Sequence, residues 1–298
     1  NVSADHLGEY GIDDVGALAD VKLTVASVVR ATGLLVLNAD DAMLCAKAGS
    51  LDLRYGPVPP IGWFSLDAEH ALLRSHRTAG GATCGVRDGH LLLVRAGEES
   101  DLGPIARMPL TVDGLASYNV ANLAGAALAA VALGVEPATV AAAFASFGAD
   151  PGDNAGRLMR FDFDGAQVLL DYAHNPDGLR GLLRVADGLR GGTGRLGLLL
   201  GHAGNREDAD FERLAAAAAE FNPDLVVVKE IEGYLRGRAP GEVPRIIRSA
   251  LLRHGLPESA LPMRSSEVEA ARCALQWSRS GDVVVLLVHS LAARAAVV

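Results

Sequence analysis

The stretch Ala166-Gln167-Val168-Leu169-Leu170-Asp171-Tyr172-Ala173-His174-Asn175-Pro176-Asp177 contains the transition on which the fold class depends. The apolar run 166–171 predicts a short buried strand, and the residues after Pro176 have the apolar spacing of a helix over 177–189. Further strand-like runs alternate with predicted helices: strands at 195–200, 224–228, 282–288 and, more weakly, 261–264, and helices at 207–221, 241–254 and 266–279. This alternation is typical of a Rossmann-like α/β domain with a mostly parallel sheet.

The residues before this domain have a more mixed pattern. Helical spacing predicts helices over 13–31, capped by Asp13 or Asp14, and over 115–133 and 137–147, and an apolar run predicts a strand at 34–38. Short runs at 61–65, 83–87 and 91–95, separated by Gly and Pro, predict small antiparallel hairpins inserted into an α/β unit. Because the stretch 148–156 is rich in Gly, Asp and Pro, we expect two domains, 1–156 and 157–298.

Composition narrows the classes of function. The chain has 27 Lys and Arg against 36 Asp and Glu, a net charge of −9, so it has no general affinity for nucleic acid or an anionic membrane. No apolar run reaches the roughly 20 residues that cross a bilayer, and the start lacks the pattern of a signal peptide. Three widely spaced cysteines suggest neither a metal site nor a disulfide framework. We therefore expect a cytoplasmic protein. Because residue 1 is not Met, we expect the sequence to begin at a cut and not at a biological terminus. Homo-oligomerisation is a possible property on which the sequence does not decide.

Polar loops follow three of the predicted strands. They cover residues 171–177, 201–208 and 229–238, and the carboxyl ends of parallel strands meet at one edge of a sheet. The Gly-rich loop Gly204-Asn205-Arg206 offers backbone N–H groups and a guanidinium to an anion. The alternative is that Asp171 and Asn175 are helix caps and Gly204 an ordinary turn residue. Three such loops on one edge favour a binding site.

Candidates in the first half are fewer. His6 has the side chain of a metal ligand, although a lone His is more often structural. Asn119 and Asn122 lie about one helical turn apart, where carboxamides could read a purine edge or cap the helix. Arg157 directly follows the linker, and its alternative role is a surface ion pair.

Five motifs occur in the order in which Mur ligases carry them. They are Asn1 to Leu7, Val36 to Asp41, Tyr118 to Asn122, Gly156-Arg157 and Asp171 to Pro176. The chain therefore resembles the Mur ligase family. Further stretches are similar to the C-terminal half of the cyanophycin synthetases: Phe64-Ser65, 74–81, 85–93, 108–111, 228–230 and 236–243. The resemblance implies a central-domain remnant with a small β-hairpin insertion, followed by the Rossmann-like C-terminal domain.

The resemblance implies an ATP-dependent amide ligase. ATP phosphorylates a carboxylate, an amine attacks the resulting acyl phosphate, and an amide remains; Mg²⁺ and positive donors neutralise the charge. The cyanophycin synthetase likeness implies addition of arginine to an aspartate side chain, so the partners are ATP and an amino-acid or polypeptide substrate. Ile231 to Tyr234 and Leu287 to Leu291 depart from the pattern of those enzymes.

The same resemblance assigns roles to single residues. His6 corresponds to a Mg²⁺ ligand, and Lys22 to the lysine that many Mur ligases carbamylate. The catalytic set is His6, Lys22, Arg157 and His174; the nucleotide set is Asn119, Asn122, Arg157, Asp171 and Asn175; the substrate set is Gly204, Asn205, Arg206, Glu230, Arg236 and Arg238. The second domain is expected to close over the nucleotide.

One family feature does not occur in these residues. The phosphate-binding loop of the family ends in Gly-Lys-Thr or Gly-Lys-Ser, whereas Lys22, Lys47 and Lys229 follow Val, Ala and Val. We therefore expect no turnover by this polypeptide alone. The alternatives are a Mur ligase of other amino-acid or peptidoglycan-precursor specificity, and a non-catalytic Mur-like module for nucleotide binding or assembly.

Overall fold

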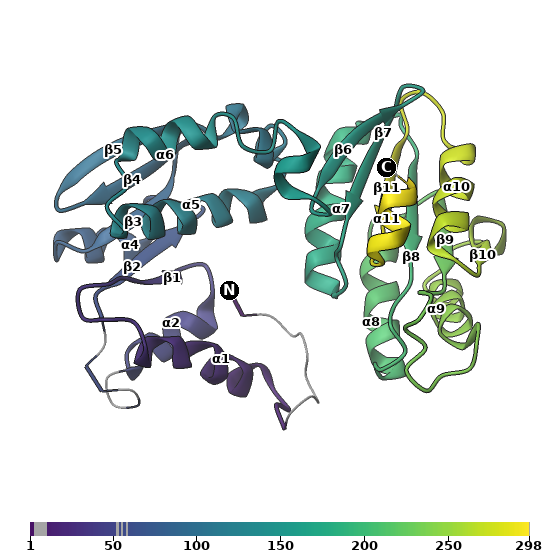
Figure 1. The fold of residues 1–298 in the computed structure, drawn as a ribbon, viewed down its shortest axis with the longest axis horizontal. Coiled ribbons are helices and arrows are strands. Elements are labelled where there is room, and N and C mark those ends of the chain that lie inside the picture. The colour runs from purple at the N-terminus through teal and green to yellow at the C-terminus, as the bar shows by residue number, and fades with distance from the viewer. Residues whose placement is uncertain (3–10, 52–53, 55, 58, 298) are drawn as a thin grey trace. The chain divides into compact units, whose positions relative to one another are not determined.

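The structure, a computed structural model, describes residues 1–2, 11–51, 54, 56–57 and 59–297 (Figure 1). The chain divides into two compact units, Asn1–Ala149 and Asp150–Val298. Each unit has its own sheet and its own core. The division falls inside the Gly/Asp/Pro-rich stretch 148–156, part of which forms a 3₁₀ helix, η4 (Pro151–Asn154).

The first unit contains a five-stranded sheet in the order β1-β2-β3-β4-β5. The first three strands are parallel and the last two are antiparallel: β1 (Leu35–Asn38), β2 (Ile61–Ser65), β3 (Ala82–Arg87), β4 (His90–Arg95) and β5 (Glu98–Pro104). Asp88 and Gly89 join β3 to β4 and both have positive φ, as a two-residue hairpin turn requires. The antiparallel hairpins therefore extend a parallel α/β sheet.

Helices cover both faces of this sheet. The apolar side of α5 (Ser117–Ala132) packs with Phe64, Cys84 and Leu93, and α6 (Pro137–Phe144) follows it. Leu23, Leu44 and Leu73 join a second cluster from the other helices: α1 (Val15–Leu23) with η1 (Thr24–Ser27), α2 (Ala42–Ala48) and α4 (Ala71–Thr78). Two short 3₁₀ helices, η2 (Ile105–Arg107) and η3 (Pro109–Thr111), lead into α5.

The second unit contains a six-stranded sheet in the order β10-β9-β8-β11-β7-β6. All pairings are parallel except that of the edge strand β6 with β7, and the strands are β6 (Met159–Phe163), β7 (Ala166–Asp171), β8 (Leu196–Leu200), β9 (Leu225–Lys229), β10 (Met263–Arg264) and β11 (Val283–Leu287). The central strands are buried along their whole length because helices cover both faces.

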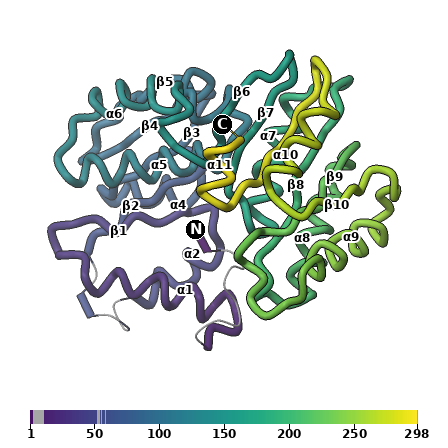
Figure 2. The backbone as a smooth tube through the Cα atoms, turned by 45° about the vertical axis from the view of Figure 1, so that its right-hand side comes forward, coloured from purple at the N-terminus to yellow at the C-terminus, as the bar shows by residue number. Residues whose placement is uncertain are grey.

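Three helices pack side by side on one face, and two lie on the other (Figures 1 and 2). The first group is α7 (Pro176–Arg190), α8 (Asp208–Ala219) and α9 (Glu242–Arg253), and the second is α10 (Glu267–Trp277) and α11 (Leu291–Val297). A 3₁₀ helix, η5 (Glu258–Ala260), precedes β10. The carboxyl ends of β7, β8, β9 and β11 consequently lie along one edge of the sheet.

The α/β class and the Rossmann-like second half are confirmed, two expectations about elements need correction, and some elements were not expected. The run 61–65 is not part of a hairpin, because it pairs in parallel with β1 and β3 across the unpredicted helix α4. The helix expected over 13–31 ends as an α-helix at Leu23. Strands β5 and β6 and helix α11 were not expected. Within the described residues, no helix is both long and apolar enough to pass through a membrane.

Candidate functional site

Four loops lie at the carboxyl edge of the second sheet. The loops after β7, β8 and β9 are the three that the sequence singled out, and the fourth, Val288 to Ser290, follows β11. Since β11 lies between β7 and β8 in the sheet, its loop joins the others at the centre of this edge. No function was predicted for this loop from the sequence, because Leu287 to Leu291 departs from the pattern of the cyanophycin synthetases.

Asp171, the last residue of β7, is buried and fixes the backbone on both sides of it. Its carboxylate accepts hydrogen bonds from the N–H groups of Leu158 and Ala173, both at 2.7 Å. Burial raises the pKa of the Asp171 carboxyl, although these two bonds and the nearby Arg157 guanidinium oppose the rise. Asp171 therefore ties the end of β7 to the residue that follows Arg157.

The ring of Tyr172 is a platform for four other side chains. The guanidinium carbons of Arg157 and Arg294 lie 5.0 and 5.9 Å from its centre, within cation–π range. The rings of His174 and His289 lie 5.4 and 5.0 Å from it, centre to centre. Positive and hydrogen-bonding groups from the segment before β6, from the loops after β7 and β11, and from α11 are thus gathered around one aromatic ring.

Arg294 reaches this ring because residue 156 has no side chain. A Cβ atom at Gly156 would lie 1.9 Å from Nη1 of Arg294, and Gly156 also has a positive φ of +79°. The Gly156-Arg157 pair therefore supplies one guanidinium and makes room for another.

Beneath the loop after β11 lies a buried cluster of Lys229, Glu267 and His289. The Lys229 ammonium is completely buried, pairs with Glu267, and lies 3.1 Å from Nδ1 of His289. The Glu267 carboxylate also accepts hydrogen bonds from the N–H groups of His289 and Ser290, at 2.9 and 2.8 Å. Glu267 thus holds the loop after β11 onto the start of α10.

Burial acts differently on the three members of the cluster. It lowers the pKa of Lys229, and it lowers the pKa of His289 to about 4, so that the imidazole is neutral near pH 7. Burial alone would raise the pKa of Glu267, but the backbone N–H of His289, which donates to the carboxylate, and the charge of Lys229 outweigh it and hold that pKa at about 2. The cluster therefore consists of the Lys229–Glu267 ion pair and, beside it, a neutral imidazole.

The buried His289 should make stability depend on pH. The unfolded chain binds a proton at His289 near pH 6.5, but the folded chain does so only near pH 4. Stability from this group is therefore complete above pH 6.5 and is lost as the pH falls from 6.5 to 4. Between pH 6.5 and 4, we expect the free energy of unfolding of the wild-type chain to fall by on the order of 2 kcal/mol more than that of His289→Gln. Urea unfolding at several pH values measures both. Parallel curves for the two proteins would contradict this account.

The loops after β8 and β9 are clipped together by Arg238. Its guanidinium donates to the carbonyl oxygens of Gly204 and Arg206, at 3.4 and 2.9 Å, and pairs with Asp208 and Glu242, at 2.8 and 2.9 Å. A Cβ atom at Gly204 would lie 2.0 Å from the carbonyl oxygen of Leu235, so only glycine fits this close approach. The structure places Gly204, Arg206 and Arg238 together, with Arg238 engaged in holding the loops.

The other predicted substrate residues differ in their surroundings. Glu230 accepts a hydrogen bond from the N–H of Gly241, at the start of α9. Arg236 is exposed, with its guanidinium carbon 5.4 Å from the centre of the Tyr234 ring, and Asn205 is exposed. Arg236 and Asn205 therefore face solvent, whereas Glu230 has a structural role in the loop.

His174 and Asn175 lie between the Tyr172 platform and α7. Asn175 caps α7, accepting a hydrogen bond from the N–H of Gly178 at 2.8 Å, as the alternative reading of this residue had it. The carbonyl oxygen of His174 lies 2.8 Å from Nε2 of His202, whose pKa is lowered by burial. His202 therefore joins the loop after β7 to the loop after β8.

The candidates of the first unit are only partly described. His6 lies outside the described residues. Lys22 is exposed on α1, and Asn122 is exposed on α5, donating to Oδ1 of Asn119 at 3.2 Å. Buried Asn119 donates in turn to the carbonyl oxygen of Leu110 at 2.9 Å, which anchors α5 to η3. Among the described residues, no group of three or more His, Cys, Asp or Glu side chains is placed to hold a metal ion.

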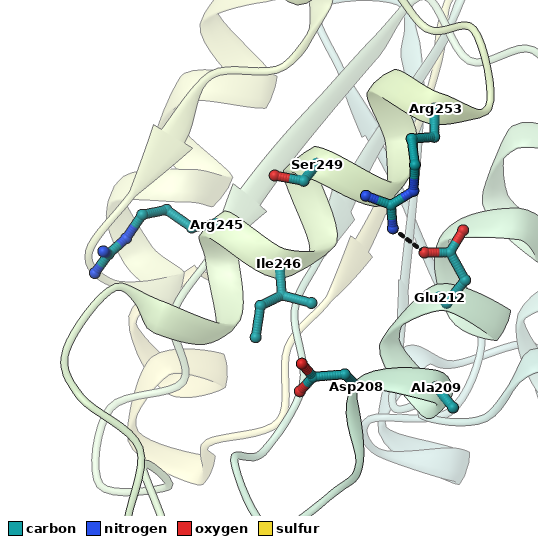
Figure 3. Close-up of a pocket in the computed structure, with 7 residues that line it drawn as sticks. All are labelled: Asp208, Ala209, Glu212, Arg245, Ile246, Ser249 and Arg253. Carbon is teal, nitrogen blue, oxygen red and sulfur yellow. Dashed lines mark hydrogen bonds and ion pairs between the residues drawn. The ribbon is translucent and has the colours of Figure 1, made fainter.

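A groove lies between α8 and α9 (Figure 3). It has a volume of about 480 Å³ and is lined by Asp208, Ala209, Glu212, Arg245, Ile246, Ser249 and Arg253. Its acids are already paired, since Glu212 binds Arg253 and Asp208 binds Arg238. Arg245 donates to the carbonyl oxygens of Gly241 and Pro240, so we assign no ligand to this groove.

Sequence reasoning missed His289, Glu267 and Arg294, and did not give Lys229 a role in the site. One signal was available: Lys229 continues the apolar run 225–228, and a charged residue that ends a buried strand needs a partner. Glu267 and His289 lie 38 and 60 residues further along the chain. The pairing therefore depends on the sheet order and could not be read from spacing.

Comparisons with known proteins agree with the motifs. Residues 156–287 match the model of the Mur ligase, glutamate ligase domain. The cyanophycin synthetase of Nostoc sp. is 31% identical over 98% of this chain and 31% of its own length. A UDP-N-acetylmuramoyl-L-alanyl-D-glutamate–2,6-diaminopimelate ligase of Gloeobacter violaceus is 30% identical over 96% of this chain and 52% of its own length. The chain thus spans about a third to a half of these relatives.

Solved structures show the same fold. A folylpolyglutamate synthase of Mycobacterium tuberculosis, complexed with ADP and AMPPCP, matches with a TM-score of 0.65 at 18% identity, over 98% of this chain and 61% of that one. MurF from Acinetobacter baumannii matches with a TM-score of 0.62 at 16% identity, over 100% and 58%. The domain match shows that residues 156–287 belong to the Mur ligase family, and the sequence relatives show that the chain along almost its whole length is similar to cyanophycin synthetases and Mur ligases.

Proposed function

We propose that this chain is part of an ATP-dependent amide ligase that works through an acyl phosphate, adding an amino acid, arginine, to an aspartate side-chain carboxylate. The observation that carries the proposal is the Tyr172 platform, where Arg157 and Arg294 lie beside a buried aspartate at the carboxyl edge. It occurs in a chain that aligns along almost all of its length with cyanophycin synthetases. The proposed enzyme works in the cytoplasm, and its partners are ATP and an amino-acid or polypeptide substrate.

The proposed chemistry has two displacements. A carboxylate oxygen bonds to the γ-phosphorus of ATP and ADP leaves; the amine nitrogen then bonds to the carbonyl carbon, phosphate leaves, and the nitrogen gives up a proton. Negative charge on the phosphoryl oxygens is the main electrostatic problem in both steps, and fixed guanidinium groups such as that of Arg157 meet it. Mg²⁺, when bound, would neutralise further phosphate charge.

The remaining roles follow the family resemblance. His6 is the proposed Mg²⁺ ligand, and exposed Lys22 the residue open to carbamylation. Asn122, with Asn119 behind it, is proposed to bind adenine, whereas Asp171, His174 and Asn175 are proposed to contact ribose and phosphate. The exposed Arg236, with Glu230 and the loop Gly204 to Arg206, is proposed to recognise the amino-acid and polypeptide substrates; Arg238 holds those loops in place.

A substrate screen tests this proposal. The full-length protein is incubated with ATP, Mg²⁺, single amino acids and an aspartate-rich peptide, and phosphate release and product mass are followed. We expect arginine with the aspartyl peptide to raise phosphate release at least about tenfold, because the site binds the transition state of its own pair best. Stimulation by another pair, such as a peptidoglycan precursor with its amino acid, would assign the enzyme to another Mur ligase specificity. ATP binding without turnover of any pair would favour the non-catalytic module.

A further inference from the structure

Two buried donors beside the Tyr172 ring have no acceptor. Nε of Arg294 and Nε2 of His289 are both buried without a hydrogen-bond partner among the residues that the structure describes. The His289 side chain is only 8% exposed. Because native proteins pair nearly all buried polar atoms, two such donors around one ring require an explanation.

The cluster beneath His289 decides which nitrogen carries its proton. The Lys229 ammonium can only donate, and it lies 3.1 Å from Nδ1, closer than the Glu267 carboxylate at 3.4 Å. Nδ1 is therefore the acceptor, and the hydrogen of the neutral ring is on Nε2. Glu267 is already occupied by Lys229 and by two backbone N–H groups. The cluster thus presents Nε2 of His289 as a donor beside the Tyr172 ring; the backbone of Ala173 lies close to it and raises the pKa of His289, but not in the geometry of a hydrogen bond.

Arg294 also contacts the Tyr172 ring, but from a different element. It lies on α11, and its guanidinium occupies the space that a side chain at Gly156 would fill. It lies against the same Tyr172 ring as Arg157, so two positive charges flank one aromatic side chain. An oxyanion bound beside this ring would offset positive charge and accept hydrogen bonds from guanidinium N–H groups.

We propose that Arg294 and His289, together with Arg157, form an oxyanion-binding subsite around Tyr172. Its ligand is an oxygen of a phosphate group or of a substrate carboxylate, which share the required charge and acceptor geometry. The inference rests on the proposed function for its place in a reaction. Binding of an oxyanion by Arg294 and His289 does not require catalysis, so it can be tested without measuring activity.

The test measures binding to the 298-residue chain by isothermal titration calorimetry. The probes are sodium tripolyphosphate and, in a second arm, N-acetyl-L-aspartate. We expect Arg294→Gln to weaken binding of the preferred probe at least about tenfold, since a charge-assisted bond is lost, and His289→Gln to weaken it about threefold. Arg294→Lys, which keeps the charge without the planar fork, should lie between wild type and Arg294→Gln.

The matched control is Arg213→Ala on α8, which removes one positive charge from a side chain that is 60% exposed. It should change the affinity less than twofold at the same ionic strength. Equal affinities of Arg294→Gln and Arg213→Ala, with both proteins folded by circular dichroism, would overturn the inference, as would a wild-type chain that binds neither probe at about 10 mM. If Arg294→Gln loses tripolyphosphate binding but the full-length protein ligates no substrate pair, the proposed function alone fails. The preferred probe distinguishes a phosphate ligand from a carboxylate.

Discussion

Replacing Glu267 with leucine is expected to destabilise the second unit by about 3–5 kcal/mol, because the change removes one partner of a buried ion pair. The Lys229 ammonium would remain fully buried without an anion, and the N–H groups of His289 and Ser290 would lose their acceptor. A buried charge without a partner is far costlier than a missing pair. The double variant Lys229→Met with Glu267→Leu should therefore recover a large part of the loss.

The two tryptophans of the chain allow this measurement to be confined to one unit. Trp63 is a core residue of the first unit, and Trp277 ends α10 in the second. In a Trp63→Phe background, urea unfolding followed by fluorescence reports on α10 and therefore on the cluster. Glu269→Leu is the matched control, since it makes the same replacement at an exposed position of the same helix and should change stability by less than about 0.5 kcal/mol. A loss below about 1.5 kcal/mol in Glu267→Leu would show that the pair is not a major support.

The pKa of Glu267 gives this prediction a pH window. Its folded pKa of about 2 lies below the ordinary value, so the stability it contributes is present above about pH 4.5 and is lost as the pH falls toward 2. The difference between wild type and Glu267→Leu should therefore shrink on acidification through that range. Most of this window lies below the interval over which His289 acts, with an overlap only between about pH 4 and 4.5, so the two groups can be separated in one titration.

The strands that could be predicted from the sequence are those whose apolar composition by itself indicates that they are buried. Runs such as 196–200 and 225–228 consist of Leu, Val and Gly, as both-face burial in a parallel sheet requires. β5 contains Glu98, Glu99 and Asp101 and, among the described strands, pairs only with β4, so its strand conformation depends on a neighbour and not on its own residues. The same holds for the edge strand β6, which pairs with β7 across a tight turn at Asp164 and Gly165.

The candidate site divides in the same way. That 171–177, 201–208 and 229–238 follow strands was visible in the sequence, and topology alone brings them to one edge. The sequence did not show which polar atoms of these loops already have hydrogen-bond or ion-pair partners within the protein. Arg238 was expected to recognise substrate, but its partners are two backbone carbonyls and two acids of neighbouring segments. Arg294 was not expected at all, because only the folded chain brings α11 against Gly156.

The 298-residue chain by itself is expected to show no ATP-dependent ligation, at least about a thousandfold below the protein extended by a strand, phosphate loop and helix ahead of residue 1. A phosphate loop supplies a nest of backbone N–H groups, a lysine and a hydroxyl for Mg²⁺. None of the three lysines of the chain can take the role of the phosphate-loop lysine from its own position. Lys229 is buried against Glu267, Lys47 is paired with Asp20, and Lys22 is exposed but lies within the helix α1.

Phosphate release and the mass of the ligated product measure both polypeptides under the same conditions. The control is the extended protein with the loop lysine changed to alanine, which should fall back toward the activity of the short chain while keeping its fold. Tripolyphosphate binding at Arg157 and Arg294 should be present in all three proteins, because that site belongs to the second unit. Turnover by the short chain would mean that residues 1–298 hold the β- and γ-phosphates without a loop, and the two arginines around Tyr172 would then be the first groups to examine.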